Sequence, residues 1–351
     1  MASITIKDIA KMCGVGVTTV SRAINNHPDI SEETKAMIMQ VIKDNHYVPN
    51  NSARNLKRSV SKTIAVLIKG ITNPFFNPMI QVFEREIQRR KYSFILQRVD
   101  EKQDEIEVAI ELEKEKRLKG IVFLGGYFSH SKEKLDQLTV PFVLSTIGMT
   151  EEFDPNDYSS VSVDDVKESY KIVDYLCNEG HRKIAIITAP MDDVSIGKLR
   201  YEGYKKALKQ HGIEYNERLV RSMREDIGSY SMENGYEVTK ELLQSGEEFT
   251  AIYAVSDSLA IGACKAIFEA GLSVPDDYSV VGFDGLDISF YYNPSITTIK
   301  QPTEEIAQET IKILFDLIDK KITHAHKTFP GELVIRNSTK RVSTSDNGLL
   351  R

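Results

Sequence analysis

Apolar residues recur at helical spacing in the first 45 residues and predict three short helices. They are expected over 6–12 with Thr5 as N-cap, over 17–25, and over 31–45. The tight turn at 14–16 contains two glycines, and two helices joined by such a turn are the signature of a helix-turn-helix. Seven apolar positions would form one small core: Ile9, Ala10, Val15, Val20, Ile24, Ile38 and Ile42.

A polar segment separates this head from the rest of the chain. The motif at 47–50 breaks the third helix, and a short helical string at 50–57 leads into a polar linker at 58–62. A helix of about eight residues is marginal on its own in water, so we expect the string to fold only when another surface packs on it. The pattern predicts a helix-turn-helix domain at 1–48 and a hinge helix with linker at 49–61.

From residue 63 onward, strand-like apolar runs alternate with amphipathic helical patterns, which predicts parallel sheets with helices on both faces. The series restarts near residue 160, so we expect two doubly wound lobes with a ligand cleft at the carboxyl ends of their strands. The strands are expected at 63–69, 92–97, 120–124, 141–145, 183–188, 219–223, 250–255 and 278–284. The helices are expected at 77–90, 103–117, 131–138, 164–179, 198–211, 230–245 and 257–270.

The end of the chain is expected to tie the two lobes together. A last helix at 302–320 and a strand near 332–336 would cross back between them. We therefore divide a core at 62–340 into two lobes and leave 341–351 as a polar tail. The predicted boundaries are 62–161 with 292–322 for the first lobe, and 162–291 with 323–340 for the second.

Composition narrows the classes of protein. With 41% hydrophobic and 27% charged residues, no apolar signal segment at the start and no stretch near the roughly 18 apolar residues of a membrane span, a cytoplasmic protein without a membrane partner is expected. Cys13, Cys177 and Cys264 lie far apart without metal-ligand spacing, so neither a disulfide framework nor a metal site is expected. Cys177 follows an apolar stripe and is interpreted as a buried thiol.

Charge is distributed unevenly along the chain. The whole sequence carries −6, but residues 1–60 hold eight Lys and Arg against five Asp and Glu, which leaves +3 on the head and −9 on the remainder. A basic head on an acidic body fits DNA binding by the head alone, although a surplus of three charges is common.

Ordered motifs from residue 4 to about 340 resemble those of the lactose/galactose repressor (LacI/GalR) family. In the head they are Thr5-Ile6-Lys7-Asp8-Ile9-Ala10, Thr19-Val20-Ser21-Arg22, Tyr47-x-Pro49-Asn50 and Ala53-Arg54-x-Leu56. In the body they include Asn73-Pro74-Phe75-Phe76, Val163-Asp164-Asp165, Arg200-x-x-Gly203-Tyr204, Ser256-Asp257 and Gly282-Phe283-Asp284. The resemblance implies an all-α helix-turn-helix domain joined to a type I periplasmic-binding-protein-like α/β core of two doubly wound parallel-sheet lobes.

The same resemblance implies a transcriptional repressor without catalytic activity or cofactor. It would be a homodimer that binds near-palindromic double-stranded operator DNA and is controlled by a small-molecule effector, expected to be a carbohydrate. The heads would enter adjacent major grooves, and the hinge helices would pair in the central minor groove. A leucine-heptad tail for tetramers is missing from the polar end of the chain, which favours a dimer.

The resemblance implies which residues of this sequence contact DNA. Val17, Thr18 and Arg22 would face base edges, where arginine can pair with guanine. Residues that would bind phosphates or position the head are Thr5, Thr19, Ser21, Asn25 and Asn50. Thr19 and Ser21 could equally cap or solvate the helix. The family often has serine where this chain has Gly16, so one phosphate-binding hydroxyl is missing.

In the hinge, Leu56 is expected to wedge into a central base step. Ala53 would let the two hinge helices approach each other, and Lys57 would reach along the groove. The alternative is that Leu56 covers an apolar patch on the sensor.

Candidate effector-binding residues follow the strand ends of the body. Aromatic faces combined with Asp and Arg suit a polyhydroxylated ligand, because rings stack on C–H groups and charged groups hydrogen-bond hydroxyls. They are Asn73, Phe75, Phe76, Asp164, Ser195, Arg200, Tyr230, Asp257 and Asp284. Phe75 and Phe76 could instead be core residues, and Asp257 could be an N-cap. Lys69-Gly70 replaces an acid-containing family segment, so either the ligand is more anionic than a plain sugar or Lys69 is a rim charge.

Two other classes of protein fit the sequence less well. A transport-type sugar-binding protein would need a secretory signal and would have no use for residues 1–60. A Rossmann-like enzyme is disfavoured because the sequence lacks a P-loop, a complete G-x-G-x-x-G, a G-x-S-x-G elbow and H-E-x-x-H. Gly14-x-Gly16 lacks the third glycine and follows a helix rather than a strand.

Overall fold

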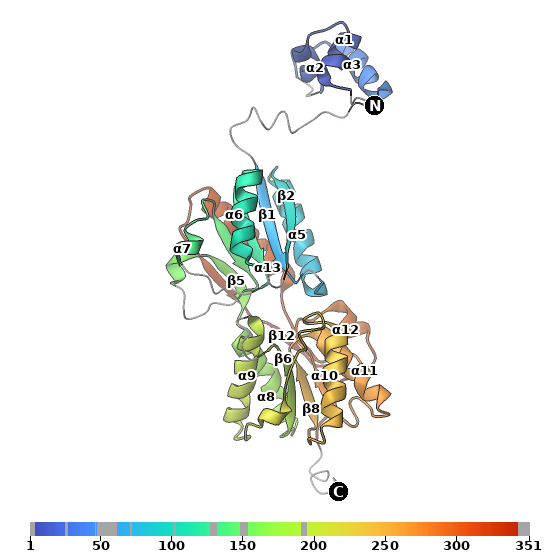
Figure 1. Cartoon of the computed structure of the whole chain (residues 1–351), viewed down its shortest axis with the longest axis vertical. Coiled ribbons are helices and arrows are strands. Elements are labelled where there is room, and N and C mark those ends of the chain that lie inside the picture. Colours follow the sequence, from blue (N-terminus) through green and yellow to red (C-terminus); the bar gives the residue numbers. More distant parts are fainter. Residues whose placement is uncertain are drawn as a thin grey trace. The chain divides into compact units, whose positions relative to one another are not determined.

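The structure is a computed structural model that describes residues 4–24, 27–45, 47, 62–70, 72–100, 103–126, 132–147, 154–190 and 195–342. The chain forms two compact units, Met1–Ser61 and Lys62–Arg351 (Figure 1). Each is described by itself below.

The described part of the head unit contains α1 (Ile6–Met12), α2 (Val17–Ile24) and α3 (Glu32–Asp44), as the sequence predicts. Thr5 caps α1 in a reciprocal arrangement, because the Asp8 amide donates to its hydroxyl and the Asp8 carboxylate accepts from the Thr5 amide at 2.8 Å. Ser31 caps α3 through the Thr34 amide. The head is short, so its buried apolar core is small and consists of Ile9, Ala10, Val20, Ala23 and Ile38.

The first lobe of the larger unit is built on a parallel sheet whose described strands run in the order β11-β5-β4-β3-β1-β2. Its strands are β1 (Thr63–Lys69), β2 (Ser93–Val99), β3 (Gly120–Leu124), β4 (Phe142–Ser145), β5 (Ser160–Val163) and β11 (His326–Phe329). Its helices are η1 (Pro74–Phe76), α5 (Asn77–Arg89), α6 (Glu105–Lys116), α7 (Lys132–Leu135), η2 (Pro155–Asp157) and α13 (Thr303–Ile318).

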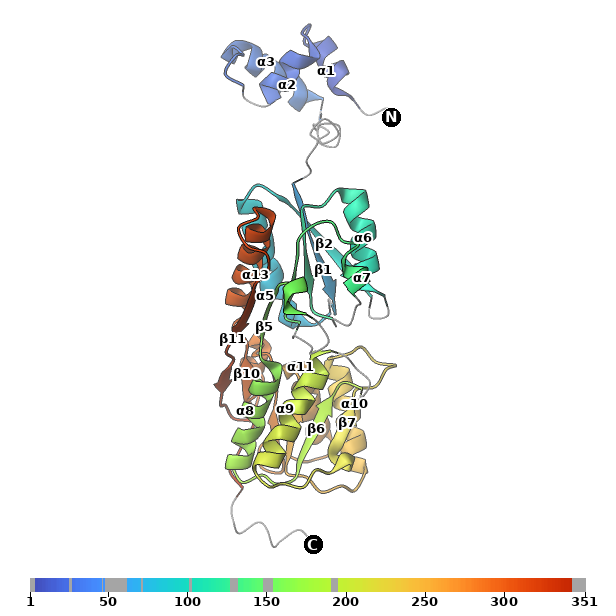
Figure 2. The same ribbon diagram turned by 90° about the vertical axis from the view of Figure 1, so that its left-hand side faces the viewer.

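Alternation along β1 explains how this sheet is covered. Ile64, Val66 and Ile68 share a buried cluster with residues of α5 and α13, whereas Ala65 and Leu67 share one with residues of α6. Successive side chains of a strand point to opposite faces, so a strand that is apolar throughout needs helices on both sides. Figure 2 shows α5 with α13 on one side of the sheet and α6 with α7 on the other.

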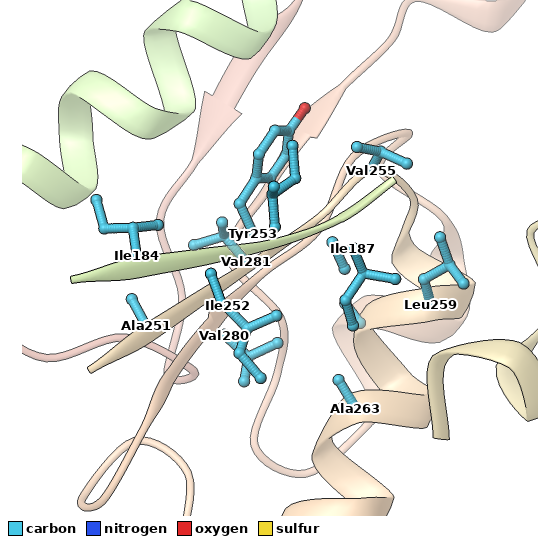
Figure 3. Packing of buried hydrophobic residues seen from close by; sticks show 14 of the residues in the cluster. Ile184, Ile187, Ala251, Ile252, Tyr253, Val255, Leu259, Ala263, Val280 and Val281 are labelled. Atoms are coloured by element: carbon cyan, nitrogen blue, oxygen red, sulfur yellow. The ribbon is translucent and has the colours of Figure 1, made fainter. Parts of the chain in front are cut away.

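The second lobe contains a parallel sheet whose described strands run in the order β7-β6-β8-β9. Its strands are β6 (Ile184–Thr188), β7 (Val220–Ser222), β8 (Ala251–Ala254) and β9 (Ser279–Val281). Its helices are α8 (Asp165–Asn178), α9 (Ile196–Gln210), η3 (Glu217–Leu219), α10 (Met232–Gln244), α11 (Asp257–Glu269) and α12 (Asp287–Tyr291). The core of this lobe lies around β8, where Ile252 and Val280 on neighbouring strands pack near Leu259 and Ala263 of α11 (Figure 3).

The sequence missed seven short elements among the described residues, namely η1, η2, η3, α12, β5, β11 and the strand at 298–300. The predicted lobe assignments of 292–322 and 323–340 are also wrong in part. Strand β11 pairs with β5 in the first sheet, although residues 323–340 were expected in the second lobe. Conversely, β10 (Thr298–Lys300) pairs with β12 (Glu332–Val334), and Thr297 bridges to β9 of the second lobe. These strands have three or four residues, and their partners lie far away in the sequence, so local periodicity could not place them.

Among the described residues, no helix is long and apolar enough to cross a membrane.

Candidate functional site

A cavity of about 400 Å³ opens between the two lobes at the carboxyl ends of their strands. It is lined by residues that directly follow β1, β3 and β6, namely Gly70, Gly125 and Ala189. In each sheet the next two strands of the chain lie on opposite sides of the first one. Strand β1 lies between β2 and β3, and β6 lies between β7 and β8. Doubly wound sheets bind ligands at this switch point, so the cavity lies where the alternation of strands and helices predicts it.

The first lobe contributes an aromatic wall. Asn73 is the N-cap of η1 and accepts from the Phe75 amide at 3.0 Å, which fixes the turn that carries both rings. Phe75 and Phe76 meet edge to face, with centroids 5.3 Å apart, and both are buried in the lobe's core as well as lining the cavity. Gly125 has a φ of +68°, and a Cβ there would lie 2.5 Å from the Phe76 ring, so this position requires glycine.

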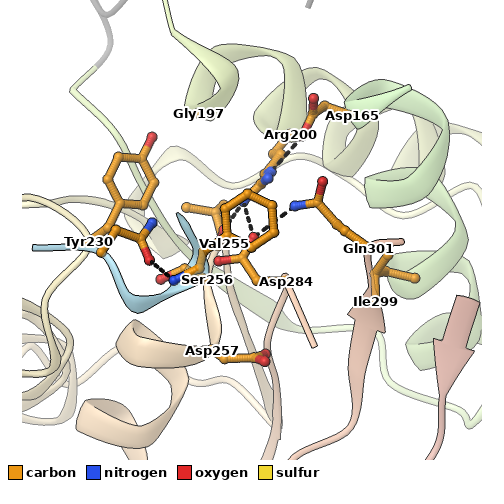
Figure 4. A network of polar contacts seen from close by, with 12 residues as sticks. Asp165, Gly197, Arg200, Tyr230, Val255, Ser256, Asp257, Asp284, Ile299 and Gln301 are labelled. Carbon is orange, nitrogen blue, oxygen red and sulfur yellow. Dashed lines mark hydrogen bonds and ion pairs between the residues drawn. The ribbon is translucent and has the colours of Figure 1, made fainter. Parts of the chain in front are cut away.

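The second lobe contributes a buried arginine held between carboxylates (Figure 4). Arg200 on α9 is 2% exposed and donates to Asp165 at 2.8 Å and to Asp284 at 3.3 Å. It also donates to the Val255 carbonyl at 2.6 Å, and its guanidinium lies 3.7 Å from the centroid of the Phe283 ring. This fixed donor fork is pre-organised for hydroxyl oxygens of a ligand.

Burial controls the protonation of this cluster. It raises the pKa of Asp284 to about 6, because the charge of Arg200 and a hydrogen bond from Gln301 at 2.9 Å offset the loss of water only in part. Burial also raises the pKa of Asp257 to about 7, and the negative charge of Asp284 adds to the effect. For Arg200 burial acts against the charged form, but Asp165 and Asp284 outweigh it and raise its pKa above the usual range. Arg200 therefore stays charged beside carboxyl groups that are easily protonated.

Two of the nine candidate effector residues are absent from the described cavity lining. Asp164 is the exposed N-cap of α8, and its carboxylate turns back to accept from the Lys167 amide at 3.0 Å. The next residue, Asp165, lines the cavity instead. Asp257 is fully buried and accepts from the Thr298 hydroxyl and the Leu286 amide, both at 2.6 Å. It is not the N-cap of α11 either, since the hydroxyl of Ser256 has that role.

The other seven candidates line the cavity: Asn73, Phe75, Phe76, Ser195, Arg200, Tyr230 and Asp284. Ser195 caps α9, and its hydroxyl lies 3.4 Å from that of Tyr230, which joins two segments of the second lobe at the rim. Sequence reasoning missed Asp165 and Gln301. Gln301 lies just before α13, where the chain crosses between lobes, and that position was the available signal.

From the sequence, Lys69 meant either a ligand more anionic than a plain sugar or a charge at the cavity rim, and the structure shows that Lys69 is not an exposed rim charge. It is 6% exposed, lines the cavity, and donates to the Glu105 carboxylate at 2.9 Å and the Gln103 carbonyl at 2.8 Å. The lysine is thus part of a buried ion pair.

The head presents the residues expected to read bases on the surface of α2. Val17, Thr18 and Arg22 are exposed, while Thr19 and Ser21 are partly buried. Thr5 is exposed at the start of α1, where its hydroxyl is occupied by Asp8 at 2.6 Å. The remaining predicted DNA contacts lie outside the described residues: Asn25, Asn50, Ala53, Leu56 and Lys57.

The two glycines of the helix-turn-helix differ. Gly14 has a φ of +65°, a conformation that L side chains rarely adopt. At Gly16 no such φ occurs, and a Cβ would meet nothing closer than the Thr19 hydroxyl at 3.8 Å. The backbone therefore has room for the serine that the family often has there.

Comparison with known proteins agrees with both halves of the chain. Residues 5–50 match the family described as bacterial regulatory proteins, lacI family, and residues 173–339 match a periplasmic binding protein-like domain. The HTH-type transcriptional regulator MalR of Clostridium butyricum is 43% identical over 335 residues, which cover 95% of this chain and 98% of that protein.

Solved structures show the same architecture. A complex of the transcriptional regulator CelR with cellobiose has a TM-score of 0.71 at 27% identity. The match covers 95% of this chain and 99% of the CelR chain. The lac repressor dimer bound to operator and the anti-inducer ONPF has a TM-score of 0.76 at 24% identity and covers 97% and 100%. Taken with the helix-turn-helix and the two-lobed cavity, these matches establish that the chain belongs to the lacI family of bacterial transcriptional regulators.

Proposed function

We propose that this protein is a repressor that binds operator DNA through α2, and that a carbohydrate bound in the cavity changes its affinity for that DNA. One observation carries the proposal: Arg200, fixed between Asp165 and Asp284, faces the same cavity as the Phe75 and Phe76 wall. Ring faces stack on the C–H surface of a sugar, and the charged groups hydrogen-bond its hydroxyls. CelR, which was solved with cellobiose, supports the ligand class.

The cavity is proposed to bind without catalysing a reaction. Its buried carboxylates and its buried guanidinium are engaged with one another, since Asp165 and Asp284 both accept from Arg200 and Asp284 also accepts from Gln301. A general acid or base must reach a reacting atom, and these groups are instead arranged to hold one another. The relatives are transcriptional regulators. A protein that acts on operator DNA would work in the cytoplasm, which is the proposed location.

A homodimer fits the surfaces of the larger unit. Among the described strands β2 is an edge of the first sheet, where backbone hydrogen-bonding groups face outward, and its Leu96 is 37% exposed. On the second lobe α12 exposes Phe290 and Tyr291, at 59% and 78%. Large exposed apolar side chains next to one another mark interfaces, and a second copy of the chain is the proposed partner. The lac repressor was solved as a dimer on its operator.

A two-stage experiment tests this function. Selection from a random pool of duplex DNA should recover a near-palindrome, and Arg22→Ala should lose preference for it while Lys43→Ala, a matched loss of charge on the exposed side of α3, should retain it. A panel of mono- and disaccharides should then change the affinity of the wild-type protein for that DNA. If no duplex is enriched, or if no sugar changes binding, the proposed function is wrong.

A further inference from the structure

The end of β1 brings a lysine into the cavity wall with its charge already neutralised. The alkyl chain of Lys69 packs against Gly126, where a Cβ would lie 3.0 Å from its Cδ. Its ammonium turns to Glu105, the first residue of α6, whose side chain is 6% exposed, like that of Lys69 itself. Removing water from an isolated ammonium is costly, so the lysine can lie here because the carboxylate accompanies it.

The other basic side chains of the described cavity lining are compensated too. Arg200 lies between Asp165 and Asp284. Arg224 donates to Asp226 at 2.8 Å and to Glu241 at 3.0 Å, and this pairing lowers the pKa of Asp226. The described lining thus contributes Lys69, Arg200 and Arg224, and their ion pairs involve five carboxylates: Glu105, Asp165, Asp226, Glu241 and Asp284.

These existing ion pairs bear on which ligand charge the cavity accepts. A neutral sugar adds no charge and can exchange hydroxyl hydrogen bonds with the ion pairs. A phosphate or carboxylate would have to break an ion pair or add its charge beside carboxylates that have none to spare for it. At the buried pairs of Lys69 and Arg200 such charges are weakly screened. Specificity of this kind comes from repulsion of the wrong ligand as much as from attraction of the right one.

We propose that the effector is an uncharged polyhydroxylated compound, and that Glu105 determines this by keeping Lys69 from serving as an anion site. The inference rests on the proposed function, since it concerns the ligand of the same cavity. It distinguishes plain sugars from sugar acids and sugar phosphates, which share ring and hydroxyls but differ in charge. Glu105 acts through Lys69 and is a positioning residue.

Matched pairs of probes test the charge preference of the full-length protein. Calorimetry and thermal shift would compare ribose with ribose 5-phosphate, glucose with glucuronate, and cellobiose with cellobiouronate, at two salt concentrations. We expect at least one neutral member to bind, and its anionic partner to bind at least about tenfold more weakly. Tighter binding of an anionic member overturns the inference and leaves the carbohydrate function standing. If neither member of any pair binds, the proposed function fails, and the inference with it.

Three variants separate Glu105 from a merely structural role. Glu105→Gln removes the carboxylate that pairs with the Lys69 ammonium, so the variant should gain affinity for the anionic probe of the responding pair by at least about tenfold while its thermal stability falls. The anionic probe should also raise the melting temperature of this variant more than that of the wild type. Glu107→Gln removes the same charge from the exposed side of α6, where Glu107 pairs with Lys134, and should leave the preference unchanged.

The double variant Lys69→Met/Glu105→Gln removes both charges of the pair. It should recover the thermal stability lost in Glu105→Gln, because well-packed neutral side chains often replace a buried ion pair without loss. It should also prefer the neutral probe, as the wild type does. If Glu105→Gln folds and gains no affinity for any anionic probe, or if Glu107→Gln gains as much, Glu105 does not set the charge preference.

Discussion

The most informative perturbation is Arg200→Met, which removes the cation between two buried carboxylates and keeps most of the side chain's volume. Arg200 is 2% exposed, and Asp165 and Asp284 are 3% and 4% exposed, so neither carboxylate can regain full hydration when the guanidinium is lost. Breaking a buried ion pair from one side costs about 3–5 kcal/mol. Domains are stable by only about 5–15 kcal/mol, so the larger unit should unfold at clearly lower denaturant concentration.

The pH dependence gives this prediction a sign. The pKa of Asp284 is already raised to about 6, and loss of the cation raises it further, so the folded variant binds protons more tightly than the unfolded chain. Its free energy of unfolding therefore increases as pH falls through that pKa. The deficit relative to the wild type should be large at about pH 8 and smaller at about pH 5. The chain has no Trp, so urea unfolding would be followed by far-ultraviolet circular dichroism.

A rescue variant separates charge from packing. Adding Asp165→Asn and Asp284→Asn to Arg200→Met removes the uncompensated charges and should recover much of the lost stability at the higher pH. Arg200→Lys keeps a positive charge without the planar donor fork, and should keep more stability than Arg200→Met while losing ligand affinity. The reasoning is refuted if the deficit of Arg200→Met is the same at both pH values and the triple variant recovers nothing, because the loss would then come from packing alone.

Three further predictions concern other parts of the chain. The pKa of Asp257 is raised to about 7, so the folded protein loses stability as the pH rises toward 7 and this buried carboxyl group must ionise. Asp257→Asn should therefore flatten the change in urea midpoint between about pH 5 and about pH 8. Thr5→Ala should lower the free energy of unfolding of the head by about 1 kcal/mol through loss of the cap, with Lys7→Ala as a control. Leu56→Ala should weaken binding to the operator by a few kcal/mol but leave binding to scrambled duplex and its salt dependence unchanged; titrations with both duplexes at several salt concentrations decide it.

Local signals in the sequence were sufficient for the longer helices and for the continuously apolar strands. The bounds of α1 agree with the prediction, because Thr5 and Gly14 mark its two ends chemically. Strand β5, Ser160–Val163, was missed although all four residues are buried. Its alternating serines resemble a solvent-facing strand, and its burial depends on β4 and β11, which pair with it on either side. Tertiary pairing, not local preference, makes this segment a strand.

The candidate site shows the same limit at the scale of single side chains. Asp164 and Asp165 were indistinguishable in the sequence, and the choice between them depends on which residue begins α8. An N-cap must direct its oxygen to the helix's free amides, so Asp164 is committed to the backbone and Asp165 to the cavity. For Lys69 the deciding partner, Glu105, lies 36 residues further along and on another element, so the sequence could show a charge but not its neutralisation.

The same contacts explain how occupancy of the cavity can reach the rest of the larger unit. Asp165 begins α8 directly after the chain leaves β5 of the first lobe, and Gln301 lies between β10 of the second lobe and α13 of the first. Both segments are therefore crossings between lobes, and each is fixed to the Arg200–Asp284 pair by a hydrogen bond of 2.8 or 2.9 Å. A ligand that hydrogen-bonds Arg200 or Asp284 competes with the groups that hold these two crossings. We therefore expect it to favour one arrangement of the lobes over another by the difference in its contacts with each.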